Sequence, residues 1–343
     1  MKHESRARSR ALYVLPALAV FALTACPAAR AQGMDSSQAL IKLMEQRREM
    51  SNRAVTETQR RRFEEGKSDT RFPSDADKAE ARPGVVRAVS PEERNALAHN
   101  ERGLELFSKG KVEQAVREYN EAIRAYPNLA AAHNNLGSAH FAAARYEEAA
   151  AAFRRAAELD PNYGQALFNL ALAQLKLGRE QEADASLQAA LRAYYTAGDE
   201  QFKAGRLKEA EESYRGMLQI DPAYVPALLR LGLVANEARR FDEAAQHLRR
   251  AAEREPANPL AHEELAEALC GLNQFDEAAA AADRALKLAP DSEGAHYFAG
   301  LARAALGQRD AALSHLARLK ELKSDDYAQR LSDFIDKKAP ARE

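Results

Sequence analysis

The chain has 343 residues, of which 50 are Lys or Arg and 51 are Asp or Glu, so its formal net charge is −1. This balance argues against a nucleic-acid-binding protein, because neutralising phosphates requires an excess of basic side chains on one face. Hydrophobic residues make up 46% and aromatic residues 7%, with no Trp, which favours a mainly helical protein over a large β-sandwich or barrel. The two cysteines exclude a disulfide scaffold and a four-thiolate metal site.

The first 31 residues have the features of a secretory signal peptide. A basic start that includes Lys2 and Arg10 precedes an apolar run from Ala11 to Ala25. This run is shorter than the about 20 residues that a membrane-spanning helix needs. A charged start, a short apolar run and small residues after it are typical of a segment that directs export.

Two cleavage sites remain open. Ala29-Arg30-Ala31 has the small residues of a signal-peptidase site, which would release the chain after residue 31. The sequence Leu23-Thr24-Ala25-Cys26 resembles the lipobox of bacterial lipoproteins, in which the cysteine becomes the lipidated first residue. We therefore expect an exported protein, either free in the periplasm or tethered to the outer membrane through Cys26.

Residues 32–90 are predicted to form a charged helix followed by a disordered linker. Between Met34 and Glu65 the apolar stripe is thin and charged residues dominate. Residues 66–90 combine Gly66, Pro73, Pro83 and Gly84 with scattered charges. Such a composition buries too little apolar surface to order itself, so this stretch is interpreted as a linker.

A repeated pattern organises the chain after Pro91. A small residue recurs at Gly103, Gly137, Ala171, Gly198, Gly232, Ala266 and Gly300. The spacing is 34 residues, except for 27 between the third and the fourth position. An alanine follows each small residue by 12 positions, and in five repeats a proline follows it by 24 positions.

This pattern resembles the tetratricopeptide repeat family, whose repeat is a pair of helices with small residues at their crossing and a proline after the second helix. The pairs Ala115/Tyr119, Ala149/Phe153 and Ala210/Tyr214 match the second helix of that repeat. The resemblance implies an all-α fold: a right-handed superhelical solenoid of about seven helix hairpins around a concave groove.

The short spacing divides the array. No proline occurs between residues 179 and 204, so we expect one long helix there, or a tight corner near Gly198. Either would separate a block of three repeats at 91–190 from a block of four repeats at 191–326. Residues 327–343 are expected to form a capping helix and a tail, because Tyr327, Leu331, Phe334 and Ile335 share one helical face.

The family resemblance implies that the first helix of each pair lines the groove and that the groove binds a protein partner. Asn135 and Asn169 lie two positions before the small residue, where their amides are expected to grip the backbone of a peptide. The other groove candidates are apolar and suit an apolar peptide or an amphipathic helix. They are Leu104, Phe107, Phe141, Phe168, Leu172, Leu175, Tyr195, Phe202, Leu229, Leu233, Tyr297, Phe298 and Leu301.

Nothing in the sequence indicates catalysis or a bound cofactor. His99, His133, His262 and His296 recur at multiples of 34 residues. Equivalent positions of adjacent repeats lie about 10 Å apart, too far to share a metal ion, so these histidines are interpreted as structural. Cys270 is interpreted as a small helix residue. Since nucleophile-elbow, P-loop and dinucleotide-binding motifs are also missing, we expect no enzyme, no metal and no small-molecule substrate.

The sequence therefore favours a non-enzymatic interaction scaffold of the cell envelope that holds a partner segment in its groove. One alternative is an outer-membrane lipoprotein that helps a secretin, a pilus or a secretion system to assemble. Another is an accessory subunit of an envelope polysaccharide or glycosyl-transfer machine.

Overall fold

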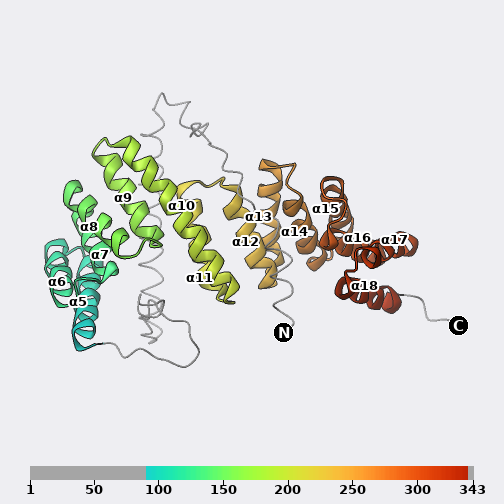
Figure 1. The fold of residues 1–343 in the computed structure, drawn as a ribbon, viewed down its shortest axis with the longest axis horizontal. Coiled ribbons are helices and arrows are strands. Elements are labelled where there is room, and N and C mark those ends of the chain that lie inside the picture. Colours follow the sequence, from blue (N-terminus) through green and yellow to red (C-terminus); the bar gives the residue numbers. More distant parts are fainter. Residues whose placement is uncertain (1–89, 339–343) are drawn as a thin grey trace. The chain divides into compact units, whose positions relative to one another are not determined.

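A computed structural model describes residues 90–338, and all the regular secondary structure of this part is α-helical (Figure 1). The all-α fold class predicted from the sequence is therefore confirmed. The expected signal peptide with Cys26, the charged segment before residue 90 and the last residues of the tail lie outside the described residues. Within residues 90–338 we find no helix whose length and apolar character would let it span a membrane.

The helices alternate with short turns. The first six are α5 (Pro91–Ser108), α6 (Val112–Ala125), α7 (Ala130–Ala142), α8 (Tyr146–Leu159), α9 (Gly164–Lys176) and α10 (Glu180–Lys203). The next four are α11 (Leu207–Ile220), α12 (Val225–Glu237), α13 (Phe241–Arg254) and α14 (Pro259–Gly271). The last four are α15 (Phe275–Leu288), α16 (Glu293–Ala305), α17 (Arg309–Glu321) and α18 (Asp325–Lys338).

The described residues form two compact units, which divide between Thr196 and Ala197, inside α10. We call them the N-terminal unit and the C-terminal unit. Helix α10 has 24 residues, so it completes the third hairpin and begins the fourth. The long helix was one of the two alternatives expected at the short repeat spacing, and it is the correct one.

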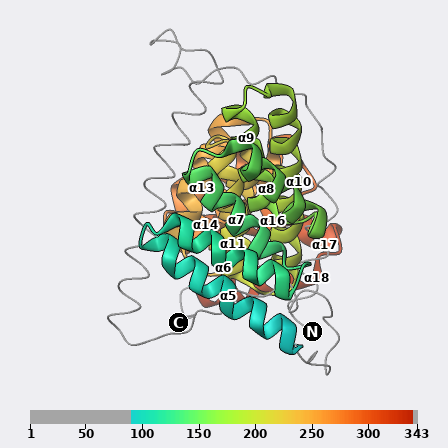
Figure 2. The same ribbon diagram turned by 90° about the vertical axis from the view of Figure 1, so that its left-hand side faces the viewer.

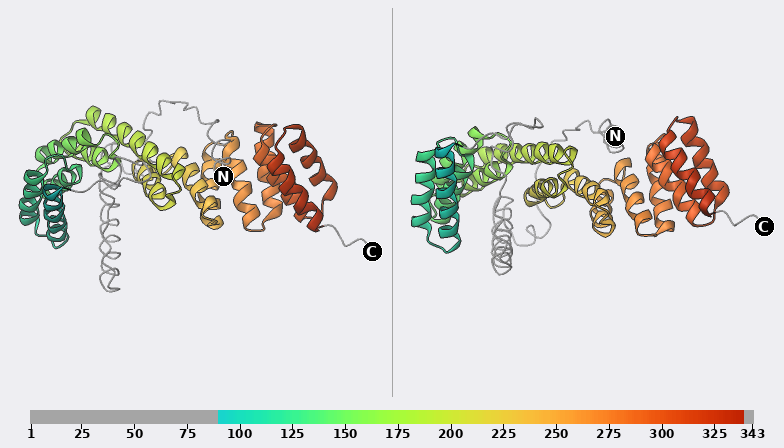
Figure 3. Two further views of the ribbon diagram at one scale, coloured as in Figure 1. Left: turned by 60° about the horizontal axis from the view of Figure 1, so that its bottom comes forward. Right: turned by 90° about the horizontal axis from the view of Figure 1, so that it is seen from below.

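Within a unit, consecutive helices form antiparallel hairpins. Figure 2 shows α5 beside α6 and α7, and Figure 3 shows the hairpins of α14 to α17 side by side. The small residues explain the close crossing of the two helices of a hairpin. A Cβ atom at Gly137 would lie 2.7 Å from the ring of Phe153, and one at Gly232 would lie 2.4 Å from Cγ of Leu248. Glycine thus lets a large buried side chain of the second helix lie directly on the backbone of the first.

Each hairpin turns through a residue in the left-handed conformation. Seven positions after the first small residue, Gly110 has a φ of 73°, and Ala144 has a φ of 58° at the same place in the next hairpin. Behind Gly110, the backbone N–H of Lys111 donates to the carbonyl of Leu106 at 2.9 Å, which closes the end of α5. This is the Schellman arrangement that ends many helices and reverses the chain.

The last helix covers the end of the array. Helix α18 packs against α16 and α17, and its Ala328, Leu331 and Ile335 are buried in the same core cluster as Leu316 and Leu319 of α17. The capping helix predicted from the spacing of apolar residues is therefore confirmed. Without it, the apolar face of the last hairpin would lie open to water.

Candidate functional site

The candidate site of the N-terminal unit is a row of amide side chains that joins its first helices. The Nδ2 of Asn135 on α7 donates to Oδ1 of Asn100 on α5 at 2.9 Å. One hairpin further on, Nδ2 of Asn169 on α9 donates to Oδ1 of Asn134 at 3.0 Å. The row thus crosses three consecutive first helices, and each bond fixes the orientation of both amides that it joins.

The row continues to α10 through Gln165 and Tyr194. Gln165 donates from Nε2 to Oδ1 of Asn169 at 2.9 Å, and the hydroxyl of Tyr194 donates to Oε1 of Gln165 at 3.1 Å. Burial raises the pKa of the Tyr194 phenol, so the hydroxyl keeps its proton and serves as the donor at the end of the row.

The two asparagines predicted from the sequence therefore differ in what they can offer to a partner. Asn169 already donates to Asn134 and accepts from Gln165. Asn135 donates one hydrogen to Asn100, and its Oδ1 has no hydrogen-bond partner within residues 90–338. Asn135 is thus the amide of the row that can accept a hydrogen bond from the backbone of a peptide.

Several apolar groove candidates of the N-terminal unit are partly exposed. Leu104 and Phe107 pack on the core cluster of α5 and α6 while keeping part of their surface accessible, and Phe141 does the same on the cluster of α7 and α8. Leu172 and Tyr195 are also partly buried. These side chains can contact a partner without leaving the core that positions them.

Other groove candidates belong to the packed core instead. Phe168 is 7% exposed, and Leu175, Leu233 and Phe298 are buried to a similar degree. Tyr297 is 6% exposed because the capping helix covers it: its ring stacks on that of Tyr327 with centroids 4.9 Å apart. The guanidinium of Arg330 lies 4.9 Å from the centroid of the Tyr297 ring. These corrections leave Leu229, Leu301 and Phe202 as the partly exposed candidates of the C-terminal unit.

A buried polar contact between α12 and α14 was missed by the sequence analysis. Asn236 is 4% exposed, and its Nδ2 donates to the backbone oxygen of Glu264 at 3.0 Å and to Oε2 of the same residue at 3.2 Å. Asn236 stands four positions after Gly232, where other repeats have Phe107, Phe141 or Phe202. The exchange of a ring for an amide was the available signal.

Sequence models of the tetratricopeptide repeat match residues 100–164 and 195–259, residues 235–297, and residues 152–185. Together these matches span more than half of the chain. The chain belongs to the tetratricopeptide repeat family. The family resemblance drawn from the small residues and prolines is thereby confirmed.

Solved structures with tetratricopeptide repeats are also similar to this chain. A chain of the APC/C hetero-tetramer Cut9-Hcn1 has 18% identity and a TM-score of 0.39, over 71% of this chain and 49% of that chain. This protein thus spans about half of the Cut9-Hcn1 chain. A repeat protein of Parabacteroides merdae has 16% identity and a TM-score of 0.35, over 71% of this chain and 99% of its own. YrrB, a repeat protein with an unusual peptide-binding site, has 21% identity and a TM-score of 0.32, over 63% and 97%. No curated protein matches the sequence.

The recurring histidines of these tetratricopeptide repeats hold the turns between hairpins. The Nε2 atoms of His133, His262 and His296 each lie 2.9 Å from the backbone oxygen of a proline six positions earlier. A carbonyl only accepts hydrogen bonds, so the imidazole donates and fixes the turn to the first helix. In the part that the structure describes, no group of three His, Cys, Asp or Glu side chains is gathered that could hold a metal ion.

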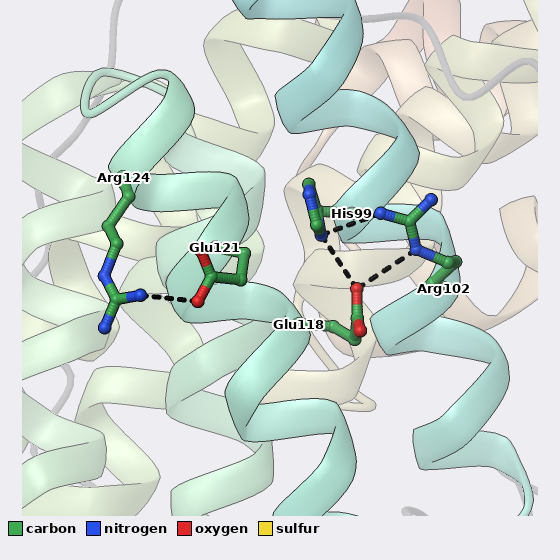
Figure 4. A network of polar contacts seen from close by, with 5 residues as sticks. All are labelled: His99, Arg102, Glu118, Glu121 and Arg124. Carbon is green, nitrogen blue, oxygen red and sulfur yellow. Dashed lines mark hydrogen bonds and ion pairs between the residues drawn. The ribbon is translucent and has the colours of Figure 1, made fainter.

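His99, in the first repeat, contacts charged side chains instead. Its Nδ1 lies 2.8 Å from Oε2 of Glu118, and Nε of Arg102 donates to the same oxygen at 3.1 Å (Figure 4). The hydrogen bonds from His99 and then Arg102 lower the pKa of the Glu118 carboxyl. This cluster joins α5 to α6 near the surface and has the character of a structural ion pair rather than a reactive site.

Proposed function

We propose that this protein is a non-catalytic interaction scaffold that holds an extended partner segment along the first helices of its N-terminal unit. Tetratricopeptide repeats stack into surfaces that bind other proteins, which gives the class of function. The observation that carries the location is the amide row, in which Asn135 keeps an acceptor oxygen next to partly exposed apolar side chains.

The row favours an extended segment over a helix. Backbone N–H groups of an extended peptide are free to donate, whereas those inside a helix are already bonded to its own carbonyls. The bond from Asn135 to Asn100 fixes the amide before a partner arrives, so little side-chain freedom is lost on binding. Leu104, Phe141 and Leu172 would then contact the apolar side chains of the segment.

A capture experiment with identification by mass spectrometry tests this proposal. The variant Asn135→Ala combined with Leu172→Glu removes the acceptor oxygen and places a charge among the apolar contacts. Partner recovery is expected to fall at least tenfold, about 1.4 kcal/mol. The control is Asn120→Ala on α6, outside the row, which should recover the partner like the wild type. Unchanged recovery by the double variant, with an unchanged helical circular-dichroism spectrum, refutes the proposal.

We further propose that the scaffold works in the cell envelope, in the periplasm. The support is the basic start and short apolar run of residues 1–31, which have the pattern of an export signal. Fusion of residues 1–31 to a reporter that is active only after export tests this directly. A reporter that stays inactive in the cytoplasm contradicts export.

Cys26 supports a second candidate, an outer-membrane lipoprotein that helps a larger envelope complex to assemble. In this case residues 32–90 would connect the lipid anchor to the repeats. Membrane fractionation and labelling with a fatty acid separate the two candidates. The lipoprotein incorporates the label and loses both label and membrane attachment in Cys26→Ser, whereas the periplasmic protein is unlabelled from the start.

A further inference from the structure

Two histidines of the C-terminal unit occupy equivalent positions but have different surroundings. The Nε2 atoms of His262 and His296 each donate to the carbonyl of a turn proline at 2.9 Å. In a neutral imidazole this leaves Nδ1 as a hydrogen-bond acceptor. For His296 the donor is present: Nδ1 of His315, 19 positions later on α17, lies 3.0 Å away.

His262 lacks this partner. The residue 19 positions after it is Ala281 on α15, whose methyl group cannot donate. His262 is only 5% exposed, and its Nδ1 has no hydrogen-bond partner among the described residues. His133 is also followed by an alanine, Ala152, but it is more exposed, so water can reach its ring. A buried acceptor without a donor costs about 1–3 kcal/mol, which a matching donor from outside would recover.

A cleft of about 600 Å³ lies beside this unpaired nitrogen. It runs between α13 and α15 with α14 between them, and we call it the α13–α15 cleft. Both His262 and Ala281 line it, together with the apolar Ala252, Leu265 and Leu269. Since Nδ1 of His296 faces residue 315, the equivalent atom of His262 faces residue 281 and the cleft.

The charged side chains of the cleft leave an excess of positive charge. Arg249 is paired with Glu277 at 2.9 Å. Arg284 and Lys287 also line the cleft and have no ion-pair partner within the described part of the chain, whereas the remaining carboxylate is that of Glu253. Two cations thus stand against one anion, which favours an acidic ligand.

We propose that the α13–α15 cleft binds a tyrosine side chain of an acidic partner segment, whose phenol donates to Nδ1 of His262. The ring fits the apolar walls, and its hydroxyl supplies the missing donor at the end of the ring. A lysine would also bring an apolar stem and a donor, but Arg284 and Lys287 repel its charge. The cleft exceeds one ring in volume, so residues beside the tyrosine can enter it and place carboxylates near those cations. This surface is separate from the amide row of the N-terminal unit.

Two peptides that differ by one oxygen atom test the hydrogen bond. The full chain is titrated by calorimetry with acetyl-EEYEE-amide and with acetyl-EEFEE-amide. The tyrosine peptide is expected to bind about tenfold more tightly, because phenylalanine leaves Nδ1 of His262 buried without a donor. Equal affinities, or no binding of the tyrosine peptide, overturn the proposal. A peptide with lysines in place of the glutamates should bind at least several-fold more weakly.

Two variants of the chain test the site. Ala281→His copies the arrangement of His315, so the new imidazole satisfies His262 and occupies the cleft, and binding should fall at least tenfold. Ala152→His, the same change beside His133 in the N-terminal unit, should bind like the wild type. His262→Leu adds no volume and has precedents in the repeats at Leu167 and Leu228. It should bind the two peptides equally. Retained binding by Ala281→His, or retained discrimination by His262→Leu, overturns the assignment.

Discussion

Gly103 lies so close to the ring of Tyr119 that a Cβ atom at residue 103 would stand 2.4 Å from Cε1 of that ring. The two residues are 16 positions apart on the two helices of one hairpin. The same separation joins Gly137 to Phe153, while Ala266 and Ala282 stand at this spacing in a later hairpin. A large side chain on the second helix thus accompanies glycine on the first, because the two share one volume.

Gly103→Ala is expected to lower the free energy of unfolding by about 1–3 kcal/mol, because the added methyl overlaps the fully buried Tyr119 ring. Urea denaturation followed by circular dichroism measures the loss. The double variant Gly103→Ala/Tyr119→Leu is the control, since the smaller side chain makes room for the methyl. It should be more stable than the sum of the two single effects predicts. Strict additivity contradicts the shared-volume explanation.

Ala144→Gly is expected to raise the free energy of unfolding by about 0.5–1 kcal/mol. Ala144 has a φ of 58°, a left-handed conformation that costs residues with a Cβ atom about 1–2 kcal/mol and glycine much less. The control is Ala143→Gly at the preceding position, where φ is −83° and glycine only adds freedom to the unfolded chain. Ala143→Gly should lower stability in the same urea experiment, and a loss of equal size in Ala144→Gly would contradict the argument.

The fold was predictable because its determinants recur with the repeat. Gly103 and Gly137 mark helix crossings, and the missing proline before Gly198 marks the fusion of two helices into α10. These signals are local: each depends on the backbone volume or the donor of one residue. Periodicity then shows the array without any knowledge of long-range contacts.

The candidate site was only partly predictable, because exposure depends on what packs over a residue. Tyr297 has the same place in its repeat as groove residues elsewhere, but α18 covers it. The sequence placed Asn135 and Asn169 on the same face, yet not the bonds to Asn100 and Asn134 that distinguish them. Such contacts join neighbouring repeats, and a position-by-position comparison of repeats does not show which side chains meet.

Cys270 is expected to resist thiol reagents in the folded protein. Burial raises the pKa of its thiol to about 12, and its Sγ lies 3.8 Å from the backbone oxygen of Phe298. Because only the thiolate reacts, modification by Ellman's reagent at pH 8 should be at least about 100-fold slower than in guanidinium chloride. The measurement uses Cys26→Ser, so that Cys270 is the thiol observed. Ala151→Cys, on the exposed face of α8, is the reactive comparison. Similar rates for the two thiols would contradict the burial argument.

The His296–His315 pair predicts a loss of stability in mild acid. Burial lowers the pKa of His315 to about 4, and the charges of Arg303 and His296 add to this effect, while Asp283 opposes it. Burial also lowers the pKa of His296. An unfolded histidine has a pKa of about 6.5, so below that pH the unfolded chain binds protons that the folded chain does not. The contribution of the pair is therefore complete above about pH 6.5 and is lost as the pH falls toward 4.

Urea midpoints between pH 7.5 and 4.7 measure this loss, in a range where most carboxyl groups remain ionised. His315→Gln should show a smaller fall over the range, because glutamine does not titrate and its amide can still donate to Nδ1 of His296. Part of the fall should persist through His140 and His247, whose pKa values burial also lowers. A pH dependence identical to that of the wild type would mean that His315 is as easily protonated in the folded chain as in the unfolded one.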